Sequence, residues 1–227
     1  MLVKVDAVLS KEEVCQCRRV LEAAPWVDGK VTAGAQSAIA KYNLQVPEDA
    51  PEARELGDLV LRALGRSATF YSAVLPLKVF PPLFNRYDAG MKFDAHVDNA
   101  IRFVTGASGR IRTDVSSTLF LSEPDEYDGG ELVIQDTYGE QKIKFGRRRS
   151  RDLSRHQPSS RRTDHARLAL ASFFWTQSMV KDDGQRALLY GFDEAIRDAR
   201  GKLGDEDAAV LALTATYHNL LRRWVEM

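Results

Sequence analysis

The sequence predicts a mainly β domain, an antiparallel sandwich or barrel, with helices before and after it along the chain. Three observations lead to this prediction. Short runs rich in β-branched and aromatic residues follow one another between positions 70 and 175, separated by Gly, Pro, Asp and Asn. Amphipathic helical patterns flank that region on both sides. The length of 227 residues, with 44% apolar and 28% charged content, suits one globular domain with at most a small appendage.

Residues 1–69 are expected to support the core with a short strand and two helices. In the first helix, Ser10 fits the N-cap position, and Glu13 three residues later completes a capping box. The second helix is expected within residues 47–67, with acids in its first half and Arg62 near its end, which suits the helix dipole. Its apolar face would consist of Leu56, Leu59, Val60 and Leu64.

Residues 70–180 are predicted to form the β core, and residues 181–227 a C-terminal helical segment. In the core, "LKVFPPLFNRY", "TDVSSTLFLS", "GGELVIQD" and "LALASFFWTQ" are predicted strands, and "EPDEYDGGEL" has the composition of a turn. After position 180 the patterns "DDGQRALLYGFDEAIRDARG" and "DEDAAVLALTATYHNLLRRWVEM" predict two amphipathic helices.

Charge and cysteine content exclude several classes of protein. Lysine plus arginine equals aspartate plus glutamate at 32 each, so the basic footprint of a typical nucleic-acid binder is absent. Cys15 and Cys17 are too close together for a disulfide framework and are expected to be free thiols. We find no signal peptide and no apolar run long enough to span a membrane, so we expect a cytoplasmic protein.

His96 and Asp98 form the chemically most informative pair in the sequence. They are separated by one residue, and on a strand such residues point to the same face. An imidazole and a carboxylate converging on one point make two thirds of the 2-His-1-carboxylate triad that binds Fe(II). By itself the pair also fits a histidine that is hydrogen-bonded to a carboxylate at a strand end.

The residues around this pair resemble a known family, the PKHD-type hydroxylases, which are relatives of the prolyl 4-hydroxylase catalytic domain in the Fe(II)/2-oxoglutarate dioxygenase superfamily. The segments that carry the resemblance keep their order over nearly the whole chain: "WVDGKVTAGAQSA", "PLFNRYDAGMKFDAHVDNAIR", "RTDVSSTLFLSEPDEYDGGELVIQDTYG", "ASFFWTQSMVKDDGQRALLY" and "YHNLLRRW".

The resemblance implies a double-stranded β-helix, or jelly roll, with iron between its two sheets. It implies Fe(II), 2-oxoglutarate as cosubstrate and L-ascorbate as cofactors, and O₂ and a small-molecule or peptidyl substrate as partners. His96 and Asp98 fall on the first two iron ligands of the family, and Tyr87 is a candidate contact for 2-oxoglutarate.

The resemblance breaks within residues 146–169. Family members carry Gly-Asp-Leu-Val-x-Tyr-Pro, then Ser-Leu-His with the second iron histidine, then Arg-Gly-x-Arg with the arginine that pairs with 2-oxoglutarate. Counting back from "LASFFW", these two positions hold Ser159 and Ala169. The length of the interval is the one expected for the family. We therefore hypothesise that the stretch is read in another frame, with a one-base slip near codon 146 and a compensating slip near codon 169.

Residues 146–167 contain eight arginines and leave three interpretations open. The run could bind nucleic acid, although it has no aromatic residue that could stack on a base. His156 or His165 could supply the third iron ligand, with Arg167 as the 2-oxoglutarate clamp. The interpretation that we favour is a disordered or poorly packed segment where a core strand should be. The enzyme would then be impaired, or would be a non-catalytic pseudoenzyme that keeps the fold.

Overall fold

The computed structural model describes residues 1–32, 35–104, 109–123, 125–126, 131–136, 139–143, 150–154, 159–162 and 169–226. The larger sheet contains β1 (Leu2–Val5), β2 (Val27–Asp28), β4 (Leu44–Gln45), β5 (Pro76–Val79), β6 (Leu83–Tyr87), β10 (Val115–Phe120), β13 (Ser150–Ser154) and β15 (Ala169–Ser178). The smaller sheet contains β3 (Lys41–Tyr42), β7 (Lys92–His96), β11 (Glu131–Asp136), β12 (Gly139–Ile143) and β14 (Ser159–Arg162). A separate hairpin joins β8 (Ile101–Phe103) to β9 (Arg110–Arg112).

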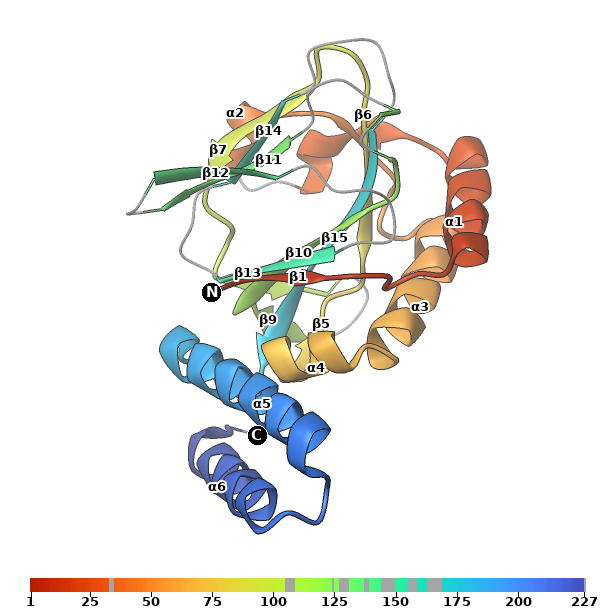
Figure 1. Ribbon diagram of the computed structural model, residues 1–227. Coiled ribbons are helices and arrows are strands. Elements are labelled where there is room, and N and C mark those ends of the chain that lie inside the picture. Colours follow the sequence, from red (N-terminus) through yellow and green to blue (C-terminus); the bar gives the residue numbers. More distant parts are fainter. Residues whose placement is uncertain are drawn as a thin grey trace.

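The two sheets are antiparallel and pack against each other (Figure 1). The larger sheet has the order β1-β13-β10-β15-β6-β4-β2, with β5 paired to β15, and the smaller sheet has the order β12-β11-β14-β7-β3. Side chains from both sheets meet between them, where Phe120 packs with Leu132 and Ile134, and Tyr87 packs with Phe93. The predicted mainly β architecture with flanking helices is confirmed, although the sheets do not close into a complete barrel along the described residues.

β15 shows how alternation divides the molecule into an inner and an outer layer. Its residues Phe173 and Trp175 point between the sheets and pack with Phe80 and Leu83. Phe174 points to the opposite face and joins the main core beneath the helices. Alternating apolar residues on both faces are expected for a strand that is covered on both sides.

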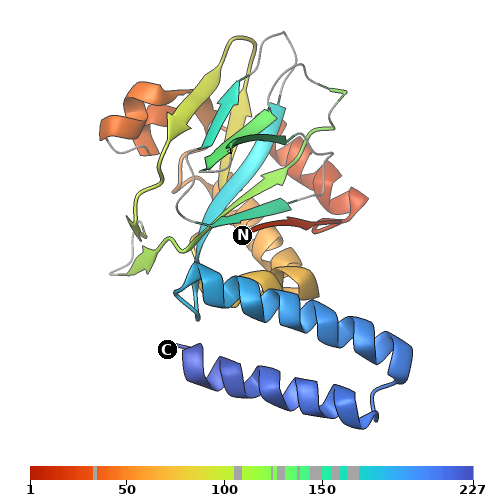
Figure 2. The same cartoon turned by 60° about the vertical axis from the view of Figure 1, so that its left-hand side comes forward.

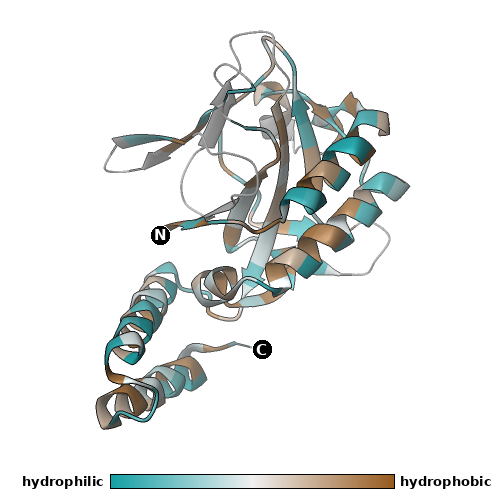
Figure 3. Ribbon diagram, turned by 45° about the vertical axis from the view of Figure 1, so that its right-hand side comes forward, coloured by the Kyte–Doolittle hydropathy of each residue, from teal (hydrophilic) through white to brown (hydrophobic). Residues whose placement is uncertain are grey.

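Three helices cover the outer face of the larger sheet: α1 (Lys11–Ala23), α3 (Pro51–Gly65) and α4 (Ala68–Val74). Figure 3 shows their apolar residues on the side that faces the sheet. The predicted capping box of α1 is confirmed, since Glu13 N donates to Ser10 Oγ at 3.1 Å and Ser10 N donates to Glu13 Oε2 at 2.8 Å. Cys15 and Cys17 are free, as expected.

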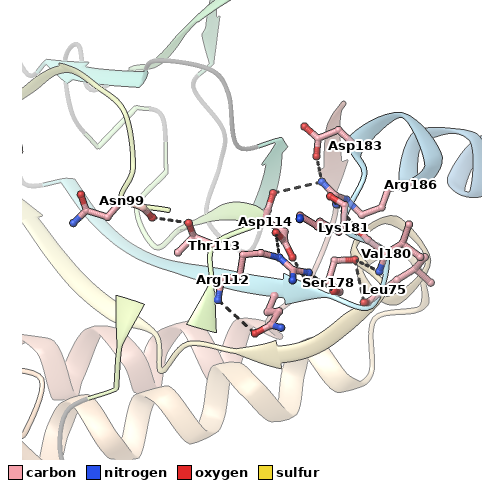
Figure 4. A network of polar contacts seen from close by, with 11 residues as sticks. Leu75, Asn99, Arg112, Thr113, Asp114, Ser178, Val180, Lys181, Asp183 and Arg186 are labelled. Carbon is pink, nitrogen blue, oxygen red and sulfur yellow. Dashed lines mark hydrogen bonds and ion pairs between the residues drawn. The ribbon is translucent and has the colours of Figure 1, made fainter. Parts of the chain in front are cut away.

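The C-terminal helices α5 (Asp183–Leu203) and α6 (Ala208–Trp224) form an antiparallel hairpin below the sheets (Figure 2). Leu189, Ile196 and Tyr217 pack on Leu75 at the end of α4. The buried Arg186 fixes the start of α5, because its guanidinium donates to the carbonyl oxygens of Val180, Lys181 and Asp114 and pairs with Asp183 (Figure 4).

Two sequence-based expectations about local structure were wrong. We favoured a disordered or poorly packed segment in the arginine-rich run, but the backbone of residues 150–154 pairs with β1 and β10, and that of residues 159–162 pairs with β11 and β7. The β core was also predicted to begin at Phe70, but this residue lies in the helix α4. Short elements that no pattern indicated are α2 (Ala35–Ala40) and the 3-10 helix η1 (Gly29–Thr32). No helix among the described residues is long and apolar enough to cross a membrane.

Candidate functional site

His96 and Asp98 converge at the end of β7, as their spacing predicts. His96 is the last residue of the strand, and its Nε2 lies 3.6 Å from Asp98 Oδ1. His96 Nδ1 lies 2.8 Å from the carbonyl oxygen of Asp94 and donates a hydrogen bond to it, while Nε2 faces Asp98. The Phe93 ring stacks on the imidazole at 3.6 Å between centroids and fixes its plane. The pair is thereby oriented as metal ligands usually are, by partners behind them.

The second oxygen of Asp98 is held by the larger sheet. Trp175 Nε1 on β15 donates to Asp98 Oδ2 at 2.8 Å. Burial by itself would raise the pKa of Asp98, but hydrogen bonds from His96, Trp175 and Ser116 outweigh it and hold that pKa below its usual value. Asp98 is therefore a carboxylate at neutral pH. Trp175 is also buried in the core, and no spacing in the sequence indicates its contact with Asp98.

Two cationic side chains lie on the inner side of the same site. Lys41 on β3 is 3% exposed, and its Nζ donates to Gln45 Oε1 at 2.8 Å between the rings of Phe93 and Phe173. The guanidinium of Arg102 on β8 lies 4.4 Å from the centroid of the Trp175 ring. Sequence reasoning missed both residues, because neither belongs to a recognisable spacing with His96.

Ser159 and Ala169 occupy the positions where the family carries its second iron histidine and its 2-oxoglutarate arginine, and strand register places both. The register of β14 on β7 sets Ser159 opposite His96, and that of β15 on β6 sets Ala169 opposite Tyr87. Ala169 is buried. The substitute ligands considered from the sequence, His156, His165 and Arg167, lie outside the described residues. Within the described part of the chain, no group of three or more His, Cys, Asp or Glu side chains could hold a metal ion.

The other residues of interest have structural contacts. Arg86 makes a bidentate ion pair with Asp88 at 2.9 and 3.1 Å. Asn85 is buried between the sheets, and its Oδ1 has no hydrogen-bond partner within the described residues. Asn99 accepts a hydrogen bond from Thr113 Oγ1 at 2.6 Å through its backbone oxygen (Figure 4). His218 on α6 packs edge-on against the ring of Tyr217.

Tyr87 is 3% exposed and packs with Ala169, Met91 and Phe93 between the sheets. Tyr87 is therefore a packing residue between the sheets. Its contact with 2-oxoglutarate stays a prediction.

Comparison with solved structures gives the class of the fold. A prolyl-4-hydroxylase from Pseudomonas putida aligns over 78% of this chain and 92% of its own, with a TM-score of 0.50 and 17% identity. HygX from Streptomyces hygroscopicus, solved with nickel, 2-oxoglutarate and hygromycin B, aligns over 79% of this chain and 77% of its own, with a TM-score of 0.50 and 15% identity. Residues 82–177 match the 2OG-Fe(II) oxygenase superfamily. The fold is therefore the jelly roll of the 2-oxoglutarate-dependent oxygenases.

Comparison with curated proteins narrows the class to a family. A PKHD-type hydroxylase of Gluconobacter oxydans (strain 621H) is 61% identical over the full length of both chains, and one of Methylobacterium nodulans is 55% identical, again over the full lengths. Residues 183–226, which form α5 and α6, match the PKHD-type hydroxylase C-terminal domain. The chain belongs to the PKHD-type hydroxylase family, whose superfamily uses Fe(II) and 2-oxoglutarate, usually with added ascorbate.

Proposed function

We propose that this chain is an iron- and 2-oxoglutarate-dependent hydroxylase whose metal site is incomplete, so that its turnover is strongly reduced. Family membership supports the reaction class. The observation that carries the defect is the register of β14, because the residue opposite His96 is Ser159 and not a histidine. A serine hydroxyl is a poor ligand for Fe(II) in a site built from imidazole and carboxylate.

The residues present fit iron only in part. His96 and Asp98 would hold one edge of an Fe(II) ion, since Nε2 of the imidazole and an oxygen of the carboxylate face each other. Bound iron and O₂ would supply the oxidising chemistry. The chain's own residues orient those two ligands and line the space between the sheets with aromatic rings, which excludes water. With Ser159 and Ala169 at the remaining positions, we derive no catalytic step for the chain as it stands.

The genetic code supports a displaced reading frame as the origin of this mismatch. In that frame each codon takes the last two bases of one codon and the first base of the next. Gln157, Pro158 and Ser159 can be encoded as CAG CCT TCA followed by T, which the displaced frame reads as Ser-Leu-His. The same shift allows Gly-Asp-Leu-Val-x-Tyr-Pro at positions 148–154 and Arg-Gly-x-Arg at positions 166–169.

A single displaced frame is thus compatible with all three family segments at the positions where the family carries them. The coding DNA tests it directly, because codons 148–169, shifted by one base, must encode the three segments. Any other displaced reading contradicts the frame hypothesis.

The functional test restores the two missing side chains with Ser159→His and Ala169→Arg. We expect the double variant to bind Fe(II) at least about 100-fold more tightly than the parent chain, because Ser159→His supplies a third ligand and even the partners behind a ligand change metal affinity by about 10–100-fold. Succinate release from 2-oxoglutarate should rise in parallel. Adding His96→Ala should abolish both gains.

The matched control is Ser160→His, which moves the imidazole by one position along β14, away from the residue whose register is opposite His96. We expect it to leave Fe(II) affinity unchanged. Parent turnover of about 1 s⁻¹ or more, an ordinary rate for an enzyme, would contradict the proposal. No gain in the restored variant would favour the alternative of a non-catalytic module that keeps the fold.

A further inference from the structure

A cavity of about 200 Å³ lies between α3 and the segment that joins β5 to β6. Its walls are mainly apolar and include Leu61 of α3, Phe80 and Pro82 of the joining segment, and Val104, which directly follows β8. An apolar cavity of about 150 Å³ can hold a benzene molecule. Pockets that enclose a whole small-molecule ligand usually have about 300 Å³ or more. The cavity therefore has the size for one apolar side chain.

Gly57 leaves the space for this cavity. It is buried in the interior of α3, where glycine is, after proline, the least favourable residue. Its φ is not positive, and among the described residues a Cβ at this position would meet only Pro82, whose Cδ lies at the ordinary contact distance of 3.6 Å. Neither the backbone conformation nor a close approach requires a glycine here. What its missing side chain provides is the open volume.

The cavity is connected to the candidate metal pair through two side chains. Phe80 in its wall packs edge-on against the ring of Trp175, with 5.8 Å between the centroids. Trp175 in turn donates to Asp98 Oδ2 at 2.8 Å. A molecule that occupied the cavity would therefore lie close to the site where the chemistry of this family takes place.

The charged residues that line the cavity do not indicate a charged ligand. Glu48 already pairs with Arg102 at 3.5 Å. Arg54 and Asp58 are exposed and opposite in charge. The apolar walls consequently decide what the cavity binds.

The strand β8 presents an open edge next to the cavity. Within the described strands it pairs only with β9. Val104 N donates to Gly109 O, so the backbone groups of Phe103, and those of Ile101 two positions earlier, point away from β9. The side chains of Ile101 and Phe103 are 50% and 74% exposed. This edge thus combines available backbone groups with an apolar surface.

We infer that the cavity at Gly57 and the edge of β8 together bind an extended polypeptide segment, one of whose apolar side chains enters the cavity. In such binding, hydrogen bonds to the added strand give affinity and a side-chain pocket gives specificity. Because β8 begins three residues after Asp98, a segment along it leads from the cavity towards the metal pair. The inference rests on the proposed function only in taking this polypeptide as the molecule that is hydroxylated.

Peptide titration of the whole chain tests the site, with EDTA present to remove metal and the backbone amide signal of Val104 followed by NMR. The probes are acetyl-Ala-Ala-Leu-Ala-Ala-amide (the leucine peptide), the same peptide with a central alanine (the alanine peptide), and acetyl-leucinamide. We expect the leucine peptide to bind at least about tenfold more tightly than the alanine peptide, because its larger side chain is buried. It should also bind at least about tenfold more tightly than acetyl-leucinamide, which cannot pair along β8.

Gly57→Leu fills the cavity and should abolish the preference for the leucine peptide. Since leucine favours a helix more than glycine does, the loss would not come from unfolding of α3. Gly57→Ala, which should reduce the preference, replaces it if the larger side chain is not tolerated. The matched control is Gly191→Leu, at an exposed glycine within α5 whose Cβ would meet nothing within 4 Å. It should keep the preference of the parent chain.

Phe103→Pro tests the edge of β8, because it removes an N–H that points away from β9 and spares the ladder of the hairpin. We expect it to weaken both pentapeptides at least about threefold relative to Phe103→Ala, which keeps the N–H.

Three results would overturn the inference: no change of the Val104 signal at about 10 mM leucine peptide, equal affinities for the leucine and alanine peptides, or an unchanged preference in Gly57→Leu. Equal affinities for the leucine peptide and acetyl-leucinamide would contradict a polypeptide ligand and indicate a small molecule. Because metal is absent throughout, an incomplete iron site would leave all of these affinities unchanged.

Discussion

Trp175 holds one oxygen of Asp98 and leaves the other facing His96. The contact bridges 77 residues of sequence and joins the larger sheet to the end of β7. It gives the carboxylate one orientation and helps to keep it ionised. Trp175 is thus a positioning residue for the candidate metal pair, in addition to its packing against Phe80 and Phe173.

Trp175→Phe should keep most of that packing and remove the N–H donor. We expect the Trp175→Phe variant to bind Fe(II) about tenfold more weakly than the parent chain does, because a metal ligand has lost the partner that orients it. The matched control is Trp26→Phe, which removes the bond from Trp26 Nε1 to Leu21 O, distant from the site in the sequence. This control should lower stability slightly and leave metal affinity unchanged. Equal effects on metal affinity would show that Trp175 acts through packing alone.

Lys41 makes stability depend on pH. Its pKa is about 8 in the folded chain and 10.5 for a free lysine side chain, so between these values the unfolded chain binds more protons at this residue. The contribution of Lys41 to stability therefore rises with pH in that interval, by about 2 kcal/mol between pH 7 and pH 9.5. The Lys41→Met variant lacks this contribution. The difference in free energy of unfolding between the parent and the variant, measured with urea, should therefore change by about 2 kcal/mol between pH 7 and pH 9.5. A constant difference would show that Lys41 is not desolvated.

At the scale of single elements, the capping box at the start of α1 involves only neighbouring residues and can be tested by one substitution. Ser10→Ala removes the side-chain acceptor of Glu13 N and breaks the capping box. We expect a loss of about 1 kcal/mol in the free energy of unfolding. Thr216→Ala, an exposed position in the middle of α6, is the control and should cost less than about 0.5 kcal/mol. The reverse order would show that the cap contributes nothing.

Elements with a local signal were the ones that could be predicted from the sequence. The capping box, the apolar stripes of α1 and α3 and the two C-terminal helices all rest on residues within a few positions of each other. β14 shows the opposite case. Its residues Ser159–Arg162 have no strand composition, and it is a strand because β11 and β7 pair with it on both sides. Composition cannot reveal such long-range pairing.

The candidate site divides in the same way. The convergence of His96 and Asp98 follows from a spacing of two residues, whereas Lys41 and Arg102 reach the site only because β3 pairs with β7 and β8 follows the metal pair. Burial of a lysine cannot be read from "KYNLQV", where polar residues alternate with apolar ones as in an exposed strand.

At the scale of the whole molecule, Arg186 joins the helical hairpin to the sheets. It is 2% exposed, and its partners are mainly carbonyl oxygens that would be left buried without it. Arg186→Leu should therefore cost about 3 kcal/mol in unfolding free energy. Arg197→Leu on the same helix removes a partly exposed ion pair with Asp193 and should cost no more than about 1 kcal/mol. Similar losses for both would contradict the anchoring role.

The contacts in Figure 4 form an unbroken path between two distant parts of the chain. From Asn99, next to Asp98, it runs through Thr113 to Asp114, whose side chain accepts from Ser178 N and whose backbone oxygen accepts from Arg186. The helical hairpin is thus joined by hydrogen bonds to the segment that follows Asp98, so substitutions at Asp114 would disturb both places at once.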